Sequence, residues 1–171
     1  MIPMEPAFTF VQGSKEEKYR ELIPQLNALL EGERDVVASL GNVAAALKMN
    51  FYDFNWVGFY FLSAMADEHP ELILGPFQGK PACTRIKVGE GVCGTSVERR
   101  QTLIVPDVRK FPGHIYCDPD SQSEIVVPLV QGRKVLGVLD IDSDRPGAFD
   151  EVDQRFLENI ASEVARKIRQ R

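Results

Sequence analysis

The stretch EIVVPLVQGRKVLGVLDID, residues 124–142, is the most informative part of this 171-residue chain. It contains two apolar runs, residues 124–130 and 134–142, separated by Gln131, Gly132 and Arg133. Short runs rich in Val, Ile and Leu on either side of a glycine turn are typical of two antiparallel strands joined in a hairpin. We therefore predict a central hairpin with its turn near Gly132.

Acidic residues lie at the open end of this predicted hairpin. Glu124 begins the first strand and lies roughly opposite the region of Asp140 to Asp142 on the second. Asp140 and Asp142 are two residues apart, so their side chains share one face of the strand. Three carboxylates can therefore meet, and their repulsion and partial burial would raise the pKa of at least one. The alternative is that strand-end acids simply face water.

Helical patterns flank the hairpin at both ends of the chain. Ser14 and Glu17 have the spacing of a capping box before a first amphipathic helix, and a second helical pattern follows Gly32. Pro24 falls inside the first pattern, which predicts a kink or a later start. Asp150 can cap a final helix whose apolar residues recur at four-residue steps.

The middle of the chain has shorter elements. Residues 56–62 and 71–77 predict a second hairpin, residues 79–94 a flexible glycine-rich segment, and residues 102–105 a strand after a short helix. Residues 106–123 predict a long loop, and such loops in compact domains are often functional. The order of elements predicts an α+β fold, a central antiparallel sheet with the N- and C-terminal helices on one face.

Composition narrows the classes of function. The chain has 20 basic and 25 acidic residues, a formal charge of −5, and its basic residues are scattered, so we expect no nucleic-acid partner. No run approaches the roughly 20 apolar residues of a membrane span. Residues 1–14 lack the features of a signal peptide and are expected to be a loosely ordered segment of a single domain, residues 1–171. We expect a cytoplasmic protein.

Three cysteines remain to be explained, and structural disulfides seldom persist in a reducing compartment. Cys117 lies in the long loop, seven residues before Glu124, and can reach the acidic site. Cys83 and Cys93 lie in the glycine-rich segment, which is flexible enough to approach Cys117. Burial as small apolar side chains is the alternative for each of them.

Histidine offers a metal-binding alternative. Together with the three cysteines, His114 could complete a Cys₃His zinc set, although no Cys-x-x-Cys pair is present. We expect no metal. His69 stands beside Pro70 and is expected to be a solvated turn residue.

Aromatic residues fall on both faces of the strand at 56–62. Trp56 and Tyr60 are four residues apart and share a face, away from Phe59 and Phe61. One face can fill the core while the other forms the wall of an apolar pocket.

Three motifs together carry a family resemblance. PACTRIKVGEGVCG (residues 81–94), FPGHIYCDPDSQSEIVVPL (111–129) and GVLDIDS (137–143) are similar to the free methionine-(R)-sulfoxide reductases, a catalytic branch of the GAF-domain superfamily. The resemblance implies a single GAF-type domain that reduces free methionine-(R)-sulfoxide and needs no cofactor. It implies that Cys117 is the nucleophile, Cys83 the resolving cysteine and Cys93 a third cysteine able to enter disulfide exchange.

The resemblance also implies the remaining partners of the reaction. Glu124, Asp140 and Asp142 match residues that hold the polar groups of the substrate, and Trp56 and Tyr60 match the pocket for its S-methyl end. A protonated carboxyl, for which Asp142 is the candidate, would donate a proton to the departing oxygen. Thioredoxin or a similar dithiol would then reduce the resulting disulfide. A homodimer is compatible with the sequence, which does not fix the oligomeric state.

A noncatalytic GAF module that binds a small regulatory ligand is the main alternative, because a fold does not determine a function. The Asn-Lys and Phe signature of cyclic-nucleotide-binding GAF domains is not visible, and Cys117 is followed by Asp118 rather than the histidine of bilin attachment.

Overall fold

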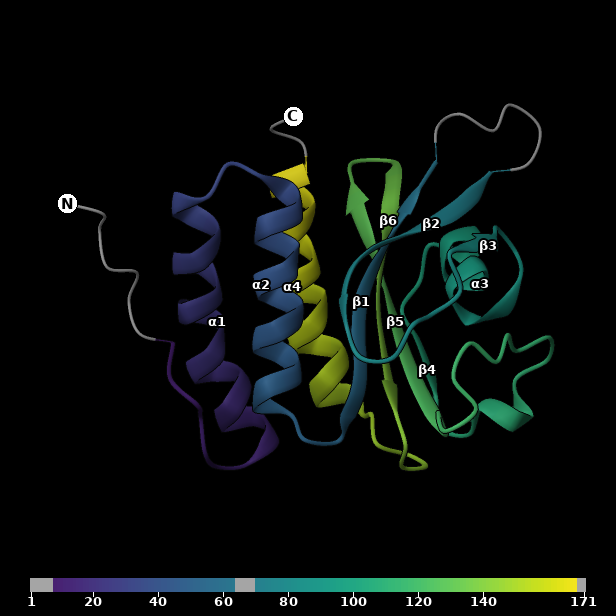
Figure 1. Cartoon of the computed structure of the whole chain (residues 1–171), viewed down its shortest axis with the longest axis horizontal. Helices are drawn as coiled ribbons and strands as arrows, with labels where there is room; N and C mark the ends of the chain where they lie inside the picture. Colours follow the sequence, from purple (N-terminus) through teal and green to yellow (C-terminus); the bar gives the residue numbers. More distant parts are fainter. Residues whose placement is uncertain (1–7, 64–69, 169–171) are drawn as a thin grey trace.

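An antiparallel sheet of six strands, in the order β3-β2-β1-β6-β5-β4, forms the middle of the molecule (Figure 1). The computed structural model describes residues 8–63 and 70–168, so the predicted turn residue His69 lies outside the described part. The strands are β1 (Phe54–Leu62), β2 (Glu71–Gln78), β3 (Arg85–Lys87), β4 (Leu103–Val105), β5 (Ser123–Gln131) and β6 (Lys134–Ser143).

The predicted central hairpin is confirmed as β5 and β6. Gln131 pairs with Lys134, and Gly132 between them has a φ of +57°, a value that glycine adopts without steric cost. Strand β6 also pairs with β1 on its other side, so the acidic end of the hairpin lies inside the sheet and not at an edge.

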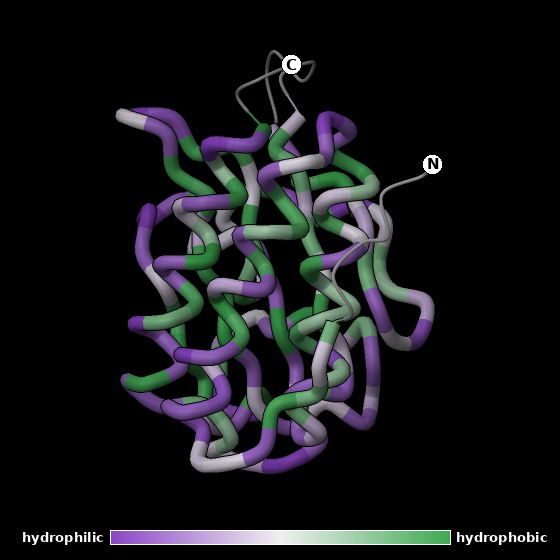
Figure 2. The backbone as a smooth tube through the Cα atoms, turned by 90° about the vertical axis from the view of Figure 1, so that its left-hand side faces the viewer, coloured by the Kyte–Doolittle hydropathy of each residue, from purple (hydrophilic) through white to green (hydrophobic). Residues whose placement is uncertain are grey.

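Helices cover the two faces of the sheet unequally. Helices α1 (Lys15–Gly32), α2 (Val36–Asn50) and α4 (Glu151–Ile168) lie on one face, with α1 outermost, which confirms the predicted placement of the terminal helices (Figure 1). The short α3 (Gly91–Arg99) and the 3₁₀ turn η1 (Val108–Lys110) lie on the other face. Viewed from the α1 side in Figure 2, hydrophilic and hydrophobic residues alternate along the helices, as expected for amphipathic elements.

Two apolar clusters follow from this arrangement. The larger one lies between the three long helices and the sheet, and its fully buried members include Leu22, Leu40, Ile125, Leu139 and Leu157. The smaller cluster lies on the opposite face and joins Trp56, Tyr60, Val92, Val126 and Val138. Because side chains alternate along a strand, β1, β5 and β6 each contribute to both clusters.

The ends of the helices follow the sequence. Ser14 and Glu17 form the predicted capping box, and α1 starts at Lys15 and runs through Pro24, so the later start was wrong. Asp150 caps α4, where its carboxylate accepts the backbone N–H of Val152 at 2.8 Å. Ahead of α1, residues 8–14 form no helix or strand, yet Val11 is buried.

None of the helices in the described part is both long and apolar enough to cross a membrane.

The segment at residues 79–94 differs from the prediction. It contains β3, which pairs with β2 at the edge of the sheet, and the first turn of α3, which begins at Gly91. Cys93 therefore lies in a helix and not in a flexible loop. The close approach of α3 to β3 explains Gly94, because a Cβ atom there would lie 2.2 Å from the carbonyl oxygen of Lys87.

Candidate active site

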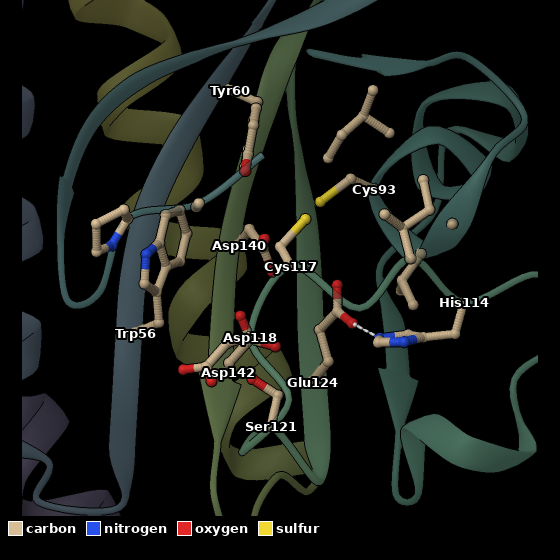
Figure 3. A pocket seen from close by; sticks show the side chains of 16 residues that line it. Trp56, Tyr60, Cys93, His114, Cys117, Asp118, Ser121, Glu124, Asp140 and Asp142 are labelled. Atoms are coloured by element: carbon tan, nitrogen blue, oxygen red, sulfur yellow. Dashed lines mark hydrogen bonds and ion pairs between the residues drawn. The ribbon is translucent and has the colours of Figure 1, made fainter. Parts of the chain in front are cut away.

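The strand register brings the predicted acidic residues together. Asp142 on β6 is paired with Glu124 on β5 and with Trp56 on β1, and Asp140 lies two residues earlier on the same face. This face is the one opposite the three long helices. The predicted meeting of three carboxylates at one place is therefore present in the structure (Figure 3).

Burial distinguishes this cluster from ordinary strand-end acids. Glu124 is 5% exposed and Asp140 is 6% exposed, so the alternative that the acids face water is wrong for these two, while Asp142 is half-buried. Burial raises the pKa of the Glu124 carboxyl well above its usual range, and the nearby charge of Asp142 raises it further. Burial also raises the pKa of Asp140 and of Asp142, each with a further contribution from a neighbouring carboxylate. The site therefore retains protons at a pH where exposed acids have lost them.

Unpaired polar atoms face the cluster. One carboxylate oxygen of Asp140 and the hydroxyl of Ser121 are buried and have no hydrogen-bond partner among the described residues. Buried polar atoms are rarely left unpaired in folded proteins, so a ligand with hydrogen-bond donors is expected here. An ammonium group fits such a set, because it brings three donors and a positive charge into a site rich in carboxylates.

One side chain from the long loop reaches the cluster without having been predicted to do so. His114 Nε2 lies 3.0 Å from Glu124 Oε2, and both side chains are almost completely buried. Sequence reasoning considered His114 only as a zinc ligand. A sequence pattern cannot reveal that the loop folds back over β5.

Two of the three cysteines are joined. Cys83 and Cys117 form a disulfide with a Cα–Cα distance of 5.4 Å, which connects the segment before β3 to the long loop before β5. The sulfur of Cys117 lies over the carboxylates in Figure 3. Cys93 is free and buried, and burial followed by the charge of Asp140 raises the pKa of its thiol.

The aromatic pair lines the site and also supports it. Trp56 and Tyr60 are buried and point to the carboxylate side of β1, as predicted. The Trp56 indole donates to the Lys80 carbonyl at 3.0 Å, and the Tyr60 hydroxyl donates to the Cys83 carbonyl at 2.9 Å. These two side chains therefore hold the segment that carries Cys83.

An ion pair joins the two cysteine-bearing segments at the mouth of the site. The Lys80 ammonium lies 3.2 Å from the Asp118 carboxylate, next to Cys117, and also pairs with Asp120. Neither Lys80 nor Asp118 was predicted as part of the site.

A small pocket unites these groups. It has a volume of about 30 Å³ and is lined by side chains from β1, α3, β5, β6 and the two cysteine-bearing segments, among them Trp56, Tyr60, Cys93, Cys117, Asp118, Ser121, Glu124, Asp140 and Asp142. With the disulfide formed, the enclosed part of the pocket therefore holds on the order of two water molecules.

The possible metal ligands differ from those considered in the sequence. The Cys₃His set is not available in this state because Cys83 and Cys117 are bonded to each other. Among the described residues, Cys93, Glu124 and Asp140 could hold a metal ion, since their ligand atoms lie within 4.8 Å of one another.

Comparison with known proteins gives consistent matches. The family model for the GAF domain matches residues 33–169. The chain is 54% identical over 149 residues to GAF domain-containing protein A of Dictyostelium discoideum, which covers 87% of this chain and 91% of that protein. It is 47% identical over 151 residues to the free methionine-R-sulfoxide reductase of Escherichia coli, with 88% of each chain covered.

A solved structure agrees over nearly the whole chain. The free methionine-R-sulfoxide reductase of Neisseria meningitidis, in complex with its substrate, superposes with a TM-score of 0.92 at 42% identity. The match covers 98% of this chain and 97% of that one.

Proposed function

Since the chain belongs to the GAF domain family and, within it, to the free methionine-R-sulfoxide reductases, we propose that it reduces free methionine-R-sulfoxide to methionine with its own cysteines. The observation that carries this proposal is the Cys83–Cys117 disulfide, which lies over a buried cluster of carboxylates. A disulfide in this place is the expected product of sulfoxide reduction by two thiols.

Recognition of the free amino acid follows from the charges of the site. Glu124, Asp140 and Asp142 surround a space with unpaired acceptor atoms, and the α-ammonium of a free amino acid supplies the missing donors and the opposite charge. A peptide amide has neither, so a methionine residue inside a protein would leave buried charge without compensation. Trp56 and Tyr60 form the apolar wall for the S-methyl end.

The first chemical step balances as the transfer of one oxygen atom. The thiol of Cys117 attacks the sulfoxide sulfur, the S–O bond of the substrate breaks, and the substrate leaves as methionine. The oxygen remains on Cys117 as a sulfenic acid, so the cysteine sulfur is oxidised by the two electrons that reduce the substrate. Asp142, which retains its proton because burial and the neighbouring Asp140 raise its pKa, donates that proton to the oxygen as it leaves the substrate sulfur, and the proton released by the Cys117 thiol restores the carboxyl, so no net proton is consumed.

The second step removes the sulfenic acid. The thiol of Cys83 attacks the sulfur of Cys117, a disulfide forms, and the oxygen leaves as water. An external dithiol of the thioredoxin type then reduces the disulfide and is itself oxidised. Recycling of this kind suits a reducing compartment, and we therefore propose a cytoplasmic location.

The oligomeric state is a separate question. A homodimer stays a prediction, and analytical ultracentrifugation of the purified protein tests it.

The decisive experiment is an anaerobic assay of the purified protein with separated R and S diastereomers of free methionine sulfoxide and dithiothreitol. We expect release of methionine from the R form only, and no comparable activity on N-acetylated methionine sulfoxide or an oxidised peptide. A protein that binds methionine sulfoxide without consuming it would instead be a sensor module, and the proposed function would be wrong.

A further inference from the structure

His114 has a buried side chain at the site, and the proposed reaction leaves it without a role. Its Nε2 atom lies 3.0 Å from Oε2 of Glu124, and the two side chains are 5% and 7% exposed. Figure 3 shows the imidazole on the far side of Glu124 from Asp142, while the second carboxylate oxygen of Glu124 points into the pocket. The histidine therefore contacts the carboxylate oxygen of Glu124 that does not point into the pocket.

The same residue is tied to the nucleophile through the backbone. His114 and Cys117 belong to one tight segment, in which the His114 N–H donates to the Phe111 carbonyl at 3.2 Å and the Cys117 N–H donates to the Ile115 carbonyl at 3.0 Å. The His114 ring also packs edge-on against the ring of Tyr116 at 4.5 Å. A shift of the imidazole would therefore be transmitted to the Cys117 sulfur three residues away.

The disulfide cannot anchor this segment through the whole reaction. It holds Cys117 against Cys83 only in the oxidised protein, and attack on the substrate requires both sulfurs to be free. The contact between His114 and Glu124 involves no sulfur, so it can persist when the disulfide is open.

We propose that His114 is a positioning residue for the reduction of methionine sulfoxide, which orients Glu124 toward the substrate ammonium and anchors the Cys117 segment to β5 in the reduced protein. This inference rests on the proposed function. It assigns no proton transfer to the imidazole.

The charges around the pair support a neutral hydrogen bond. Burial lowers the pKa of His114 and raises that of Glu124, so neither group favours its charged form. The ionisable groups that line the same pocket are Tyr60 on β1, Cys93 on α3, Asp140 and Asp142 on β6, and Asp118 on the long loop, with Tyr116 against the ring. None of these groups carries a positive charge, so the His114–Glu124 pair has no cationic neighbour among the side chains that line the pocket.

The test compares two substitutions at this position with a neighbouring control. A glutamine amide can donate to Glu124 or accept from it, whereas a phenylalanine ring fills the space without any hydrogen bond. We expect H114F to raise KM and to lower kcat/KM for free methionine-R-sulfoxide by about tenfold or more, and H114Q to stay within about threefold of the wild type. The control Y116F keeps the aromatic ring and should leave both constants unchanged.

The outcomes separate this inference from the proposed function. A wild-type protein that does not reduce methionine-R-sulfoxide overturns the proposed function. An active wild type with an equally active H114F, or with H114Q as impaired as H114F, overturns the positioning role. A second measurement does not depend on catalysis. The ¹⁵N resonances of the His114 ring should differ between the wild type and E124Q, because the variant changes the hydrogen-bond partner of the imidazole. Identical resonances would show that the hydrogen bond between the two residues is absent in solution.

Discussion

The two bonded cysteines should fail in different ways when they are replaced. Without Cys117 there is no nucleophile, so C117S should release no methionine even in a single turnover. Without Cys83 the first attack survives, so C83S should release about one equivalent of methionine per site and leave Cys117 as a sulfenic acid. Quenched single-turnover assays of methionine release measure both expectations.

Mass spectrometry with a sulfenic-acid trap such as dimedone locates the oxidised sulfur in C83S. An adduct on Cys93, with Cys117 unmodified, would reverse the proposed assignment. The double variant C83S/C93S provides the control, because any slow recycling of C83S that depends on Cys93 disappears in it.

Replacing Asp142 should lower the rate of the reaction without lowering the stability of the fold. Replacement by asparagine keeps the shape of the side chain but removes the proton that we assign to the departing oxygen, so kcat of D142N should fall by about 10² or more. The melting temperature should not fall, since the variant removes a buried carboxyl whose ionised form is disfavoured. Near-normal turnover in D142N would remove this carboxyl from the mechanism.

At the scale of elements, the hairpin of β5 and β6 was predictable because two short apolar runs rich in β-branched residues flank a glycine turn. The predicted turn placed Glu124 roughly opposite the region of Asp140 to Asp142, and in the structure Glu124 pairs with Asp142. Strand β3 was missed because it has three residues, too few for a pattern, and pairs only at the edge of the sheet. The contact of His114 with Glu124 was missed because it depends on the path of an aperiodic loop.

The sequence also did not predict how deeply the carboxylates of the site are buried. Asp140 follows the apolar run of β6, a place where strand-end acids commonly face water. In the structure, β1 and β5 flank this strand on both sides and the two cysteine-bearing segments cover it. The raised pKa values of the carboxylates follow from this coverage, which only the assembled fold reveals.

The two cysteine-bearing segments should control access to the pocket. With Cys83 bonded to Cys117 the enclosed part of the pocket has a volume of about 30 Å³, and we expect an amino acid to enter more readily once the segments separate. Isothermal titration should therefore show that L-methionine, as the product, binds reduced protein at least about tenfold more tightly than oxidised protein, a difference of about 1.4 kcal/mol. C83S kept under reducing conditions should bind methionine like the reduced wild type, and equal affinities in both redox states of the wild type would contradict the prediction.

On the scale of the whole molecule, one face of the sheet carries most of the apolar core and the other face carries the candidate active site. The face under α1, α2 and α4 buries a large apolar core, which supplies most of the free energy of folding. The opposite face carries a smaller apolar cluster beside three carboxylates that burial disfavours in their charged form. The first face offsets the destabilisation that the second one introduces, as is common for functional sites.

This division predicts how the stability of the molecule depends on pH. A carboxyl with a raised pKa in the folded state binds its proton more tightly there than in the unfolded chain, so its contribution to stability is fully present below the unfolded pKa of about 4 and is lost as the pH rises toward the folded pKa. Asp140 is the clearest case, because it is 6% exposed and one of its oxygens has no hydrogen-bond partner among the described residues. The variant D140N lacks the titrating group and should be more stable than the wild type at pH 7, by about 1–3 kcal/mol.

Urea unfolding of both proteins between pH 4 and pH 8 measures this difference. The gap should close near pH 4, where the aspartate is protonated in both states, and it should widen as the pH rises. The matched control is D144N, which makes the same chemical change at an exposed aspartate near the same end of the sheet. If D140N is less stable than the wild type at pH 7, or if the gap does not change with pH, then the charged form of Asp140 is satisfied within the fold and the carboxylate cluster is not a destabilising feature held for function.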